Sequence, residues 1–225
     1  MVYSGRFYTD PDVCTFSIHE TGKYLFPGTG AVNERGEGEG FGTNYNMPME
    51  PYTEDDSWLE CFEEVLQKVI ATFKPDVILS QHGCDAHALD PLSHVHCSMH
   101  IYEQMPLIIR DLAEQWCSGR WIALGGGGYD IWRVVPRAWS LLWLTMTDHK
   151  LLEELRLNKE LALPTEWINQ WQPHSEEELP TTWLDQVQFW TPMPRRQQIV
   201  EENRHNKTIS HAVLTEQSVS IAWFF

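Results

Sequence analysis

Hydrophobic and polar positions alternate with a helical period in three parts of the chain. The clearest is the segment between Thr53 and Pro75, where apolar residues recur on one face: Trp58, Phe62, Val65, Leu66, Val69, Ile70 and Phe73. Thr53 is the expected N-cap of this helix, and Pro75 follows its end. Residues 97–116 form a second helical pattern, with Pro106 expected to mark a kink or a new first turn, and residues 131–146 a third.

Short apolar runs lie between these helical patterns. The runs "DVILSQ" (76–81) and "RWIAL" (120–124) lack alternation, which is typical of strands covered on both faces. Two further extended segments are expected at 13–18 and 43–48. Strands and helices that follow one another with short connections predict an α/β domain with a parallel sheet.

The last third of the chain has a different composition. From about Leu151, Trp, Pro and Glu dominate, and we expect this part to wrap over the domain as an irregular extension. The expected organisation is a main domain at 1–150, an extension of the same domain at 151–208, and an atypical tail at 209–225.

Charge and cysteine content narrow the class of protein. The 225 residues include 32 acidic and 16 basic side chains, a net charge of −16, which argues against binding to nucleic acid or to an anionic membrane surface. The longest apolar run, at 138–146, is too short to span a bilayer. Five cysteines without a CxxC pair favour a reducing compartment, so a cytoplasmic protein is expected.

Polar and glycine-rich segments follow two of the predicted strands. "QHGCDAH" (81–87) comes after the first and "GGGGYD" (125–130) after the second, and ligands of parallel sheets lie at such strand ends. The GxGxxG fingerprint fails because Asp130 occupies its sixth position, and no Walker pattern is present. These features argue against a nucleotide site.

Each candidate residue at these strand ends has two interpretations. Asp85 is either a metal ligand or a loop carboxylate that caps the next helix. His82, His87 and His94 are either ligands or ordinary hydrogen-bonded side chains, and the spacing of His82 and His87 does not fit a helical zinc pair. Tyr129 is either functional or closes a glycine turn. Two such strand ends in one sheet favour a shared site.

Three separated motifs together carry a family resemblance. "FSIHETGKYLFPGTG", "QHGCDAHALDPLSH" and "ALGGGGYD" resemble, in this order, the zinc-dependent deacetylases of the arginase/deacetylase fold, in the bacterial branch related to class I histone deacetylases. The resemblance extends from about Phe7 to about Arg204. It implies a parallel-sheet arginase/deacetylase fold and an acetylated lysine protein or peptide as substrate.

The resemblance also implies roles for individual residues. Asp85 matches one aspartate ligand of the catalytic zinc, and Tyr129 matches the tyrosine that stabilises the oxyanion of the tetrahedral intermediate. Phe26 matches an aromatic residue of the acetyl-lysine tunnel, and Gly127 and Gly128 lie where small residues leave room for substrate. Zinc in such a site polarises the amide and activates water.

Two monovalent cation sites are implied as well. Ser17 and Ile18 match ligands of a structural cation, usually K⁺. Phe7, Asp10 and Val13 match a second, peripheral site that binds mainly through carbonyl oxygens.

One family motif has no counterpart in this sequence. The other two zinc ligands lie in a segment written DxDxHHGxG, expected just before "FYTDPDV", where this chain reads "MVYSGR". The histidine pair that acts as general base is absent too. We therefore expect a fold that is incomplete at its N-terminal side. Two hypotheses stay open: a zinc deacetylase that works only with a companion N-terminal half, or a catalytically inactive truncated fragment or interaction remnant. For this polypeptide alone, inactivity is favoured.

Overall fold

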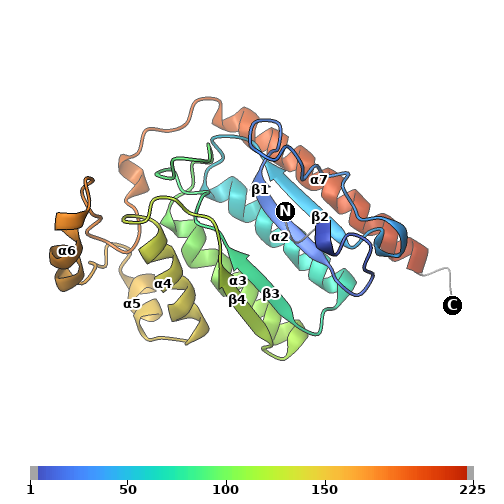
Figure 1. Cartoon of the computed structure of the whole chain (residues 1–225), viewed down its shortest axis with the longest axis horizontal. Coiled ribbons are helices and arrows are strands. Elements are labelled where there is room, and N and C mark those ends of the chain that lie inside the picture. The colour runs from blue at the N-terminus through green and yellow to red at the C-terminus, as the bar shows by residue number, and fades with distance from the viewer. Residues whose placement is uncertain (1–4, 222–225) are drawn as a thin grey trace.

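Two pairs of parallel strands form the β-structure of the protein (Figure 1). In the computed structural model, which describes residues 5–221, β1 (Thr15–Glu20) pairs with β2 (Asn44–Met49). β3 (Ile78–His82) pairs with β4 (Trp121–Gly125). The prediction of an α/β fold with parallel strands is confirmed.

Three helices follow the strands in the predicted order. They are α2 (Asp55–Phe73), α3 (Met99–Cys117) and α4 (Val135–Met146), and α3 packs against both α2 and α4. α3 runs through Pro106 without a break. The predicted Thr53 cap is wrong, because Glu54 occupies the N-cap position and the Thr53 hydroxyl donates to the Glu50 carbonyl instead, at 2.6 Å.

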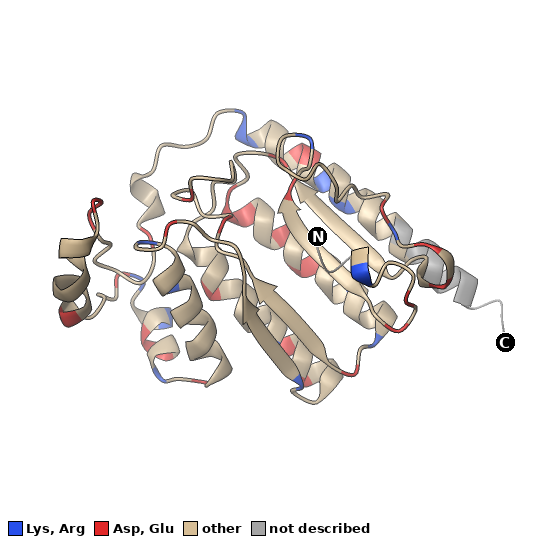
Figure 2. Cartoon of the chain, in the orientation of Figure 1, with Lys and Arg blue, Asp and Glu red and all other residues tan. Residues whose placement is uncertain are grey.

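The described residues cover only one face of the pair formed by β3 and β4. Side chains alternate along a strand, so Leu79, Ile122 and Leu124 share the other face. Leu79 is 58% exposed and Ile122 51% exposed. Figure 2 shows no charged residue on either strand, and Gln81 is the one polar side chain of these two strands on a face that is otherwise apolar. The expectation that both faces are covered is therefore wrong for residues 5–221.

The last third contains more helix than the sequence predicts. It contains the following elements: α5 (Leu151–Leu157), α6 (Thr165–Trp171), η2 (Gln172–His174), η3 (Val187–Phe189) and α7 (Arg196–Ile221). One further short 3-10 helix, η1 (Gly38–Gly40), lies earlier in the chain, before β2. α7 continues across the expected boundary between 151–208 and 209–225, and residues 222–225 of that tail lie outside the described residues. The expectation of an irregular extension is wrong for 196–221.

α7 lies along α2 and β2 (Figure 1) and is held there by a buried polar contact. Asn203 is fully buried, and its Nδ2 donates to Thr53 Oγ1 at 2.8 Å and to Ser57 Oγ at 3.0 Å. Its Oδ1 accepts from the Glu50 N–H at 2.9 Å. All hydrogen-bonding atoms of this amide group that face the core therefore have partners.

None of the helices within residues 5–221 has the length and apolar character required to cross a bilayer.

Candidate functional site

The two strand ends singled out by the sequence lie next to each other. His82 and Gly125 are paired in the register of β3 and β4, so the loops that follow start at the same edge of the sheet. The Cys84 N–H donates to the Gly127 carbonyl at 2.6 Å and joins the two loops directly. The predicted juxtaposition of these segments is present in the structure.

The carboxylate of Asp85 lies against the α-carbons of two glycines. A Cβ atom on Gly83 would stand 2.7 Å from Asp85 Oδ1, and one on Gly127 would stand 3.0 Å from Oδ2. Burial raises the pKa of Asp85, and the carboxylates of Asp90 and Glu20 raise it further. A bound cation would favour the ionised form of Asp85 at this position.

The helix-capping interpretation of Asp85 is wrong. The N-cap of α3 is Ser98, whose hydroxyl accepts from the His100 N–H at 3.1 Å. Ser98 is in turn held by Asp55, which accepts from the Ser98 backbone at 2.7 Å and from its hydroxyl at 2.6 Å. Asp85 therefore stands in the loop without a capping role.

Tyr129 directly follows the four glycines, before the turn at 131–134, and the residue is 52% exposed. Its backbone N–H donates to Asp90 Oδ2 at 2.8 Å, while Oδ1 of the same carboxylate accepts from the Leu92 N–H at 2.9 Å. Asp90 was not among the sequence candidates. The only local signal was the Asp90–Pro91 pair, which is typical of turns in general.

Gly128 and Phe26 differ in what the structure requires of them. Gly128 has φ of +135°, and a Cβ there would stand 2.7 Å from the Cys84 Cβ, so a side chain at this position would be strained. Phe26 lies in the loop after β1 and is 92% exposed. Its role in a substrate tunnel stays a prediction.

The three histidines of the motif "QHGCDAHALDPLSH" each have a protein partner. His82 Nε2 lies 2.8 Å from Ser80 Oγ, and burial lowers the pKa of His82 to about 4. His87 bonds Asp185, and His94 bonds Glu20 through Nδ1 at 2.8 Å. These partners agree with the interpretation of the histidines as hydrogen-bonded structural side chains.

A catalytic zinc site needs three protein ligands and an open position. Among residues 5–221, no cluster of three or more His, Cys, Asp or Glu side chains could hold a metal ion. Asp85 supplies one carboxylate, in a space that two glycines keep open. The residues that the structure describes do not by themselves fit a catalytic zinc.

The residues assigned to monovalent cations occupy β1 and the segment before it. Ser17 Oγ lies 2.9 Å from His19 Nδ1, and Ile18 sits within β1 opposite Met47. The Phe7 carbonyl accepts from the Asp10 N–H at 3.0 Å. The assignments of Ser17, Ile18, Phe7, Asp10 and Val13 stay predictions.

Comparisons with curated proteins extend over almost the whole chain. The sequence is 48% identical over 212 residues to acetoin utilization protein AcuC of Bacillus subtilis (strain 168), a match that covers 94% of this chain and 52% of that protein. It is 45% identical over 197 residues to AcuC of Staphylococcus xylosus, covering 88% of this chain and 49% of that protein. The chain spans about half the length of the curated relatives it matches.

Solved structures show the same relationship. A histone deacetylase homologue in complex with SAHA superposes with a TM-score of 0.71 at 26% identity, over 91% of this chain and 53% of that one. A homologue from Aquifex aeolicus gives a TM-score of 0.66 at 24% identity, over 91% of this chain and 53% of that one, and supports the fold alone. Because the model of the histone deacetylase domain also matches residues 4–146, this chain belongs to the histone deacetylase family.

Proposed function

We propose that this chain is the part of a metal-dependent lysine deacetylase that carries Asp85 and Tyr129, and that it acts together with a segment bearing two further metal ligands. The observation that carries the proposal is the joined pair of loops at the ends of β3 and β4. There the Asp85 carboxylate packs on Gly127, two residues before Tyr129. Zinc is the proposed metal, and acetylated lysine in a protein or peptide is the proposed substrate.

The residues of this chain have defined tasks in such an enzyme. Asp85 would supply one anionic ligand, and Gly127 keeps the space that its carboxylate occupies. Tyr129 would donate a hydrogen bond from its exposed phenol to the oxygen on which negative charge develops. Asp90 accepts from the backbone N–H of Tyr129 and so holds the main chain from which that phenol extends.

The bare face of β3 and β4 supports the need for a companion segment. Leu79, Ile122 and Leu124 are exposed together, and an apolar sheet face of this kind is normally covered. The AcuC relatives are about twice the length of the match, so they carry additional residues that could cover such a face. The same face also favours a second candidate function, that of a non-catalytic binding protein.

A fluorogenic acetyl-lysine assay with added Zn²⁺ tests the proposal. It is run on this chain alone and with a separately produced segment that carries the DxDxHHGxG motif. We expect no hydrolysis by the chain alone, activity in the mixture, and loss of that activity in Asp85→Ala. Stable association without activity would favour the binding protein. Activity of the chain alone that survives Asp85→Ala would overturn the assignment of the metal ligand.

A further inference from the structure

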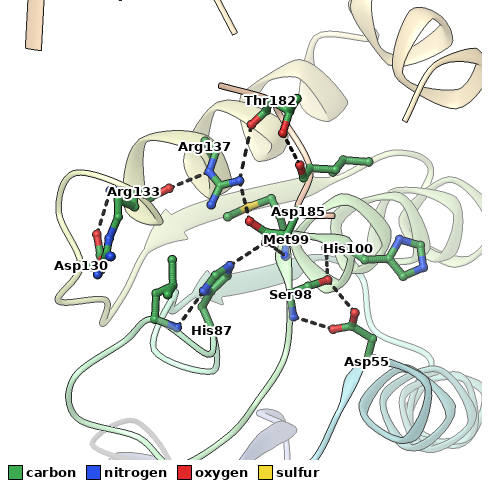
Figure 3. Close-up of polar contacts among 12 residues, drawn as sticks. Asp55, His87, Ser98, Met99, His100, Asp130, Arg133, Arg137, Thr182 and Asp185 are labelled. Atoms are coloured by element: carbon green, nitrogen blue, oxygen red, sulfur yellow. Dashed lines mark hydrogen bonds and ion pairs between the residues drawn. The ribbon is translucent and has the colours of Figure 1, made fainter. Parts of the chain in front are cut away.

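Asp185 lies beyond the residues that match the deacetylase domain, yet it contacts both the loop that carries Asp85 and the helix α4 (Figure 3). Its Oδ2 is 2.9 Å from His87 Nε2 and accepts from the Met99 N–H at 2.7 Å. Its Oδ1 accepts from Arg137 Nη1 at 2.9 Å. One carboxylate therefore joins the loop after β3, the start of α3, and α4.

The second contact of His87 shows which ring nitrogen carries the proton. His87 Nδ1 accepts from the Leu89 N–H at 3.1 Å, so the neutral ring must carry its proton on Nε2 and donate it to Asp185. His87 is two residues after Asp85 in the same loop. The hydrogen bond to Asp185 thus anchors the backbone next to the proposed metal ligand.

The Arg137 branch leads toward Tyr129. Arg137 Nε donates to the Arg133 carbonyl at 2.6 Å, and Arg133 forms an ion pair with Asp130, with 2.6 Å between Nη2 and Oδ2 (Figure 3). Asp130 directly follows Tyr129. The carboxylate of Asp185 is therefore linked directly to the loop after β3, and indirectly, through Arg137 and Arg133, to Asp130 beside Tyr129.

Burial makes these contacts consequential. The side chains of His87 and Arg137 are 0% and 1% exposed, and that of Asp185 is 11% exposed. Burial alone would raise the pKa of Asp185, but the hydrogen bond from His87 and the charge of Arg137 outweigh it and hold this pKa below its usual value. Asp185 is the only carboxylate among the described contacts of the buried Arg137 guanidinium. Removing it would leave a buried charge without an ionic partner, which lowers the free energy of unfolding.

We infer that Asp185 is a positioning residue: it clamps the Asp85 loop to the helix that follows Tyr129, from a part of the chain outside the matched domain. The clamp keeps the carboxylate of Asp85 and the phenol of Tyr129 in a fixed relation. This role rests on the proposed function, whereas the clamp itself can be measured without it.

Hydrogen exchange followed by mass spectrometry on the whole chain tests the clamp. In Asp185→Asn, which keeps size but loses charge, we expect exchange at 84–98 and 126–134 to become at least about tenfold faster, while α2 and β2 keep their protection. Glu60→Gln, which weakens the ion pairs of Glu60 with Arg204 and Lys207 between α2 and α7, is the control and should leave both loops unchanged. Unchanged loops in Asp185→Asn, or an equal rise over the whole chain, would overturn the inference.

His87→Leu covers the case in which Asp185→Asn does not fold. It removes one branch, so exchange should rise at 84–98 and stay slow at 126–134, and an unchanged first loop would contradict the clamp. In the reconstituted enzyme, Asp185→Asn should lower kcat about tenfold with KM unchanged. Loosened loops with normal kcat would refute the positioning role. An inactive wild-type mixture would instead count against the proposed function, and the exchange result would still decide the clamp.

Discussion

Asp90 accepts a hydrogen bond from the backbone N–H of Tyr129, with 2.8 Å between Oδ2 and N. The two residues come from different loops, one after β3 and one after β4, and Asp90 is buried. The contact holds the backbone of Tyr129 while the residue stays 52% exposed, so its phenol extends from a main chain that is held in place.

Tyr129→Phe should therefore remove a donor without disturbing the turn. In the reconstituted enzyme we expect kcat to fall about 100-fold or more, the typical loss for one oxyanion donor, with little change in KM. Tyr52→Phe is a matched control because Tyr52 is 51% exposed and lines a surface pocket together with residues of α7. Its contact with the loop after β3 runs from its backbone N–H to the His94 carbonyl, and the substitution keeps that contact. Steady-state kinetics measure kcat and KM of both variants and of the wild type. An unchanged kcat in Tyr129→Phe would remove Tyr129 from the proposed mechanism.

Gly127→Ala should weaken metal binding. The new Cβ would stand 3.0 Å from Asp85 Oδ2, which is tighter than ordinary contact, so the carboxylate must move. We expect about tenfold lower affinity for Zn²⁺ in the reconstituted enzyme, measured by competition with a chromophoric chelator. Gly5→Ala, where a Cβ meets nothing within 4 Å, should bind like the wild type. Equal affinities for the two variants would show that the space beside Asp85 is not needed.

His82 should make the stability depend on pH. Its pKa is about 4 in the folded chain and 6.5 when unfolded, so protons bind the unfolded chain first as the pH falls. The free energy of unfolding should drop by up to about 3 kcal/mol between pH 6.5 and 4, and this contribution is absent above pH 6.5.

His82→Gln should lack this loss. The measurement is urea unfolding of both proteins at pH 7.5 and pH 4.5, comparing the change in unfolding free energy. An identical change in wild type and variant would show that His82 is not the group responsible.

Asn203→Ala should loosen α7. The substitution leaves the Glu50 N–H and the buried hydroxyls of Thr53 and Ser57 without this amide, and a loss of about 2–3 kcal/mol in the free energy of unfolding is expected. Gln197→Ala, at an exposed position of the same helix, should cost less than about 0.5 kcal/mol. Urea unfolding followed by circular dichroism measures both, and equal stabilities would contradict a fixed α7.

Local patterns predicted the elements that place the candidate site. The helical period of α2 and the apolar runs of β3 and β4 are properties of neighbouring residues, so they could be recognised without the fold. The glycines and polar residues after each strand indicated the shared edge, and the parallel register of His82 with Gly125 confirmed it. The motifs were specific enough to predict the family, which the comparisons confirmed.

The sequence pattern could not predict which faces of β3 and β4 are covered, or that residues 196–221 form a helix. Whether Leu79 is covered depends on what packs over it, and its sequence neighbours do not contain that information. α7 presents the polar Asn203 to the core, so it lacks the apolar stripe by which a helix is usually predicted.

The contacts that organise the site come from the tertiary structure alone. His87 and Asp185 are 98 positions apart, and Asp90 and Tyr129 are 39 apart. A hydrogen bond between such residues leaves no periodic trace in the sequence, because it depends on the path of all the chain between them. The sequence by itself determined which residues stand at the strand ends, and only the fold decided which carboxylates hold them in place.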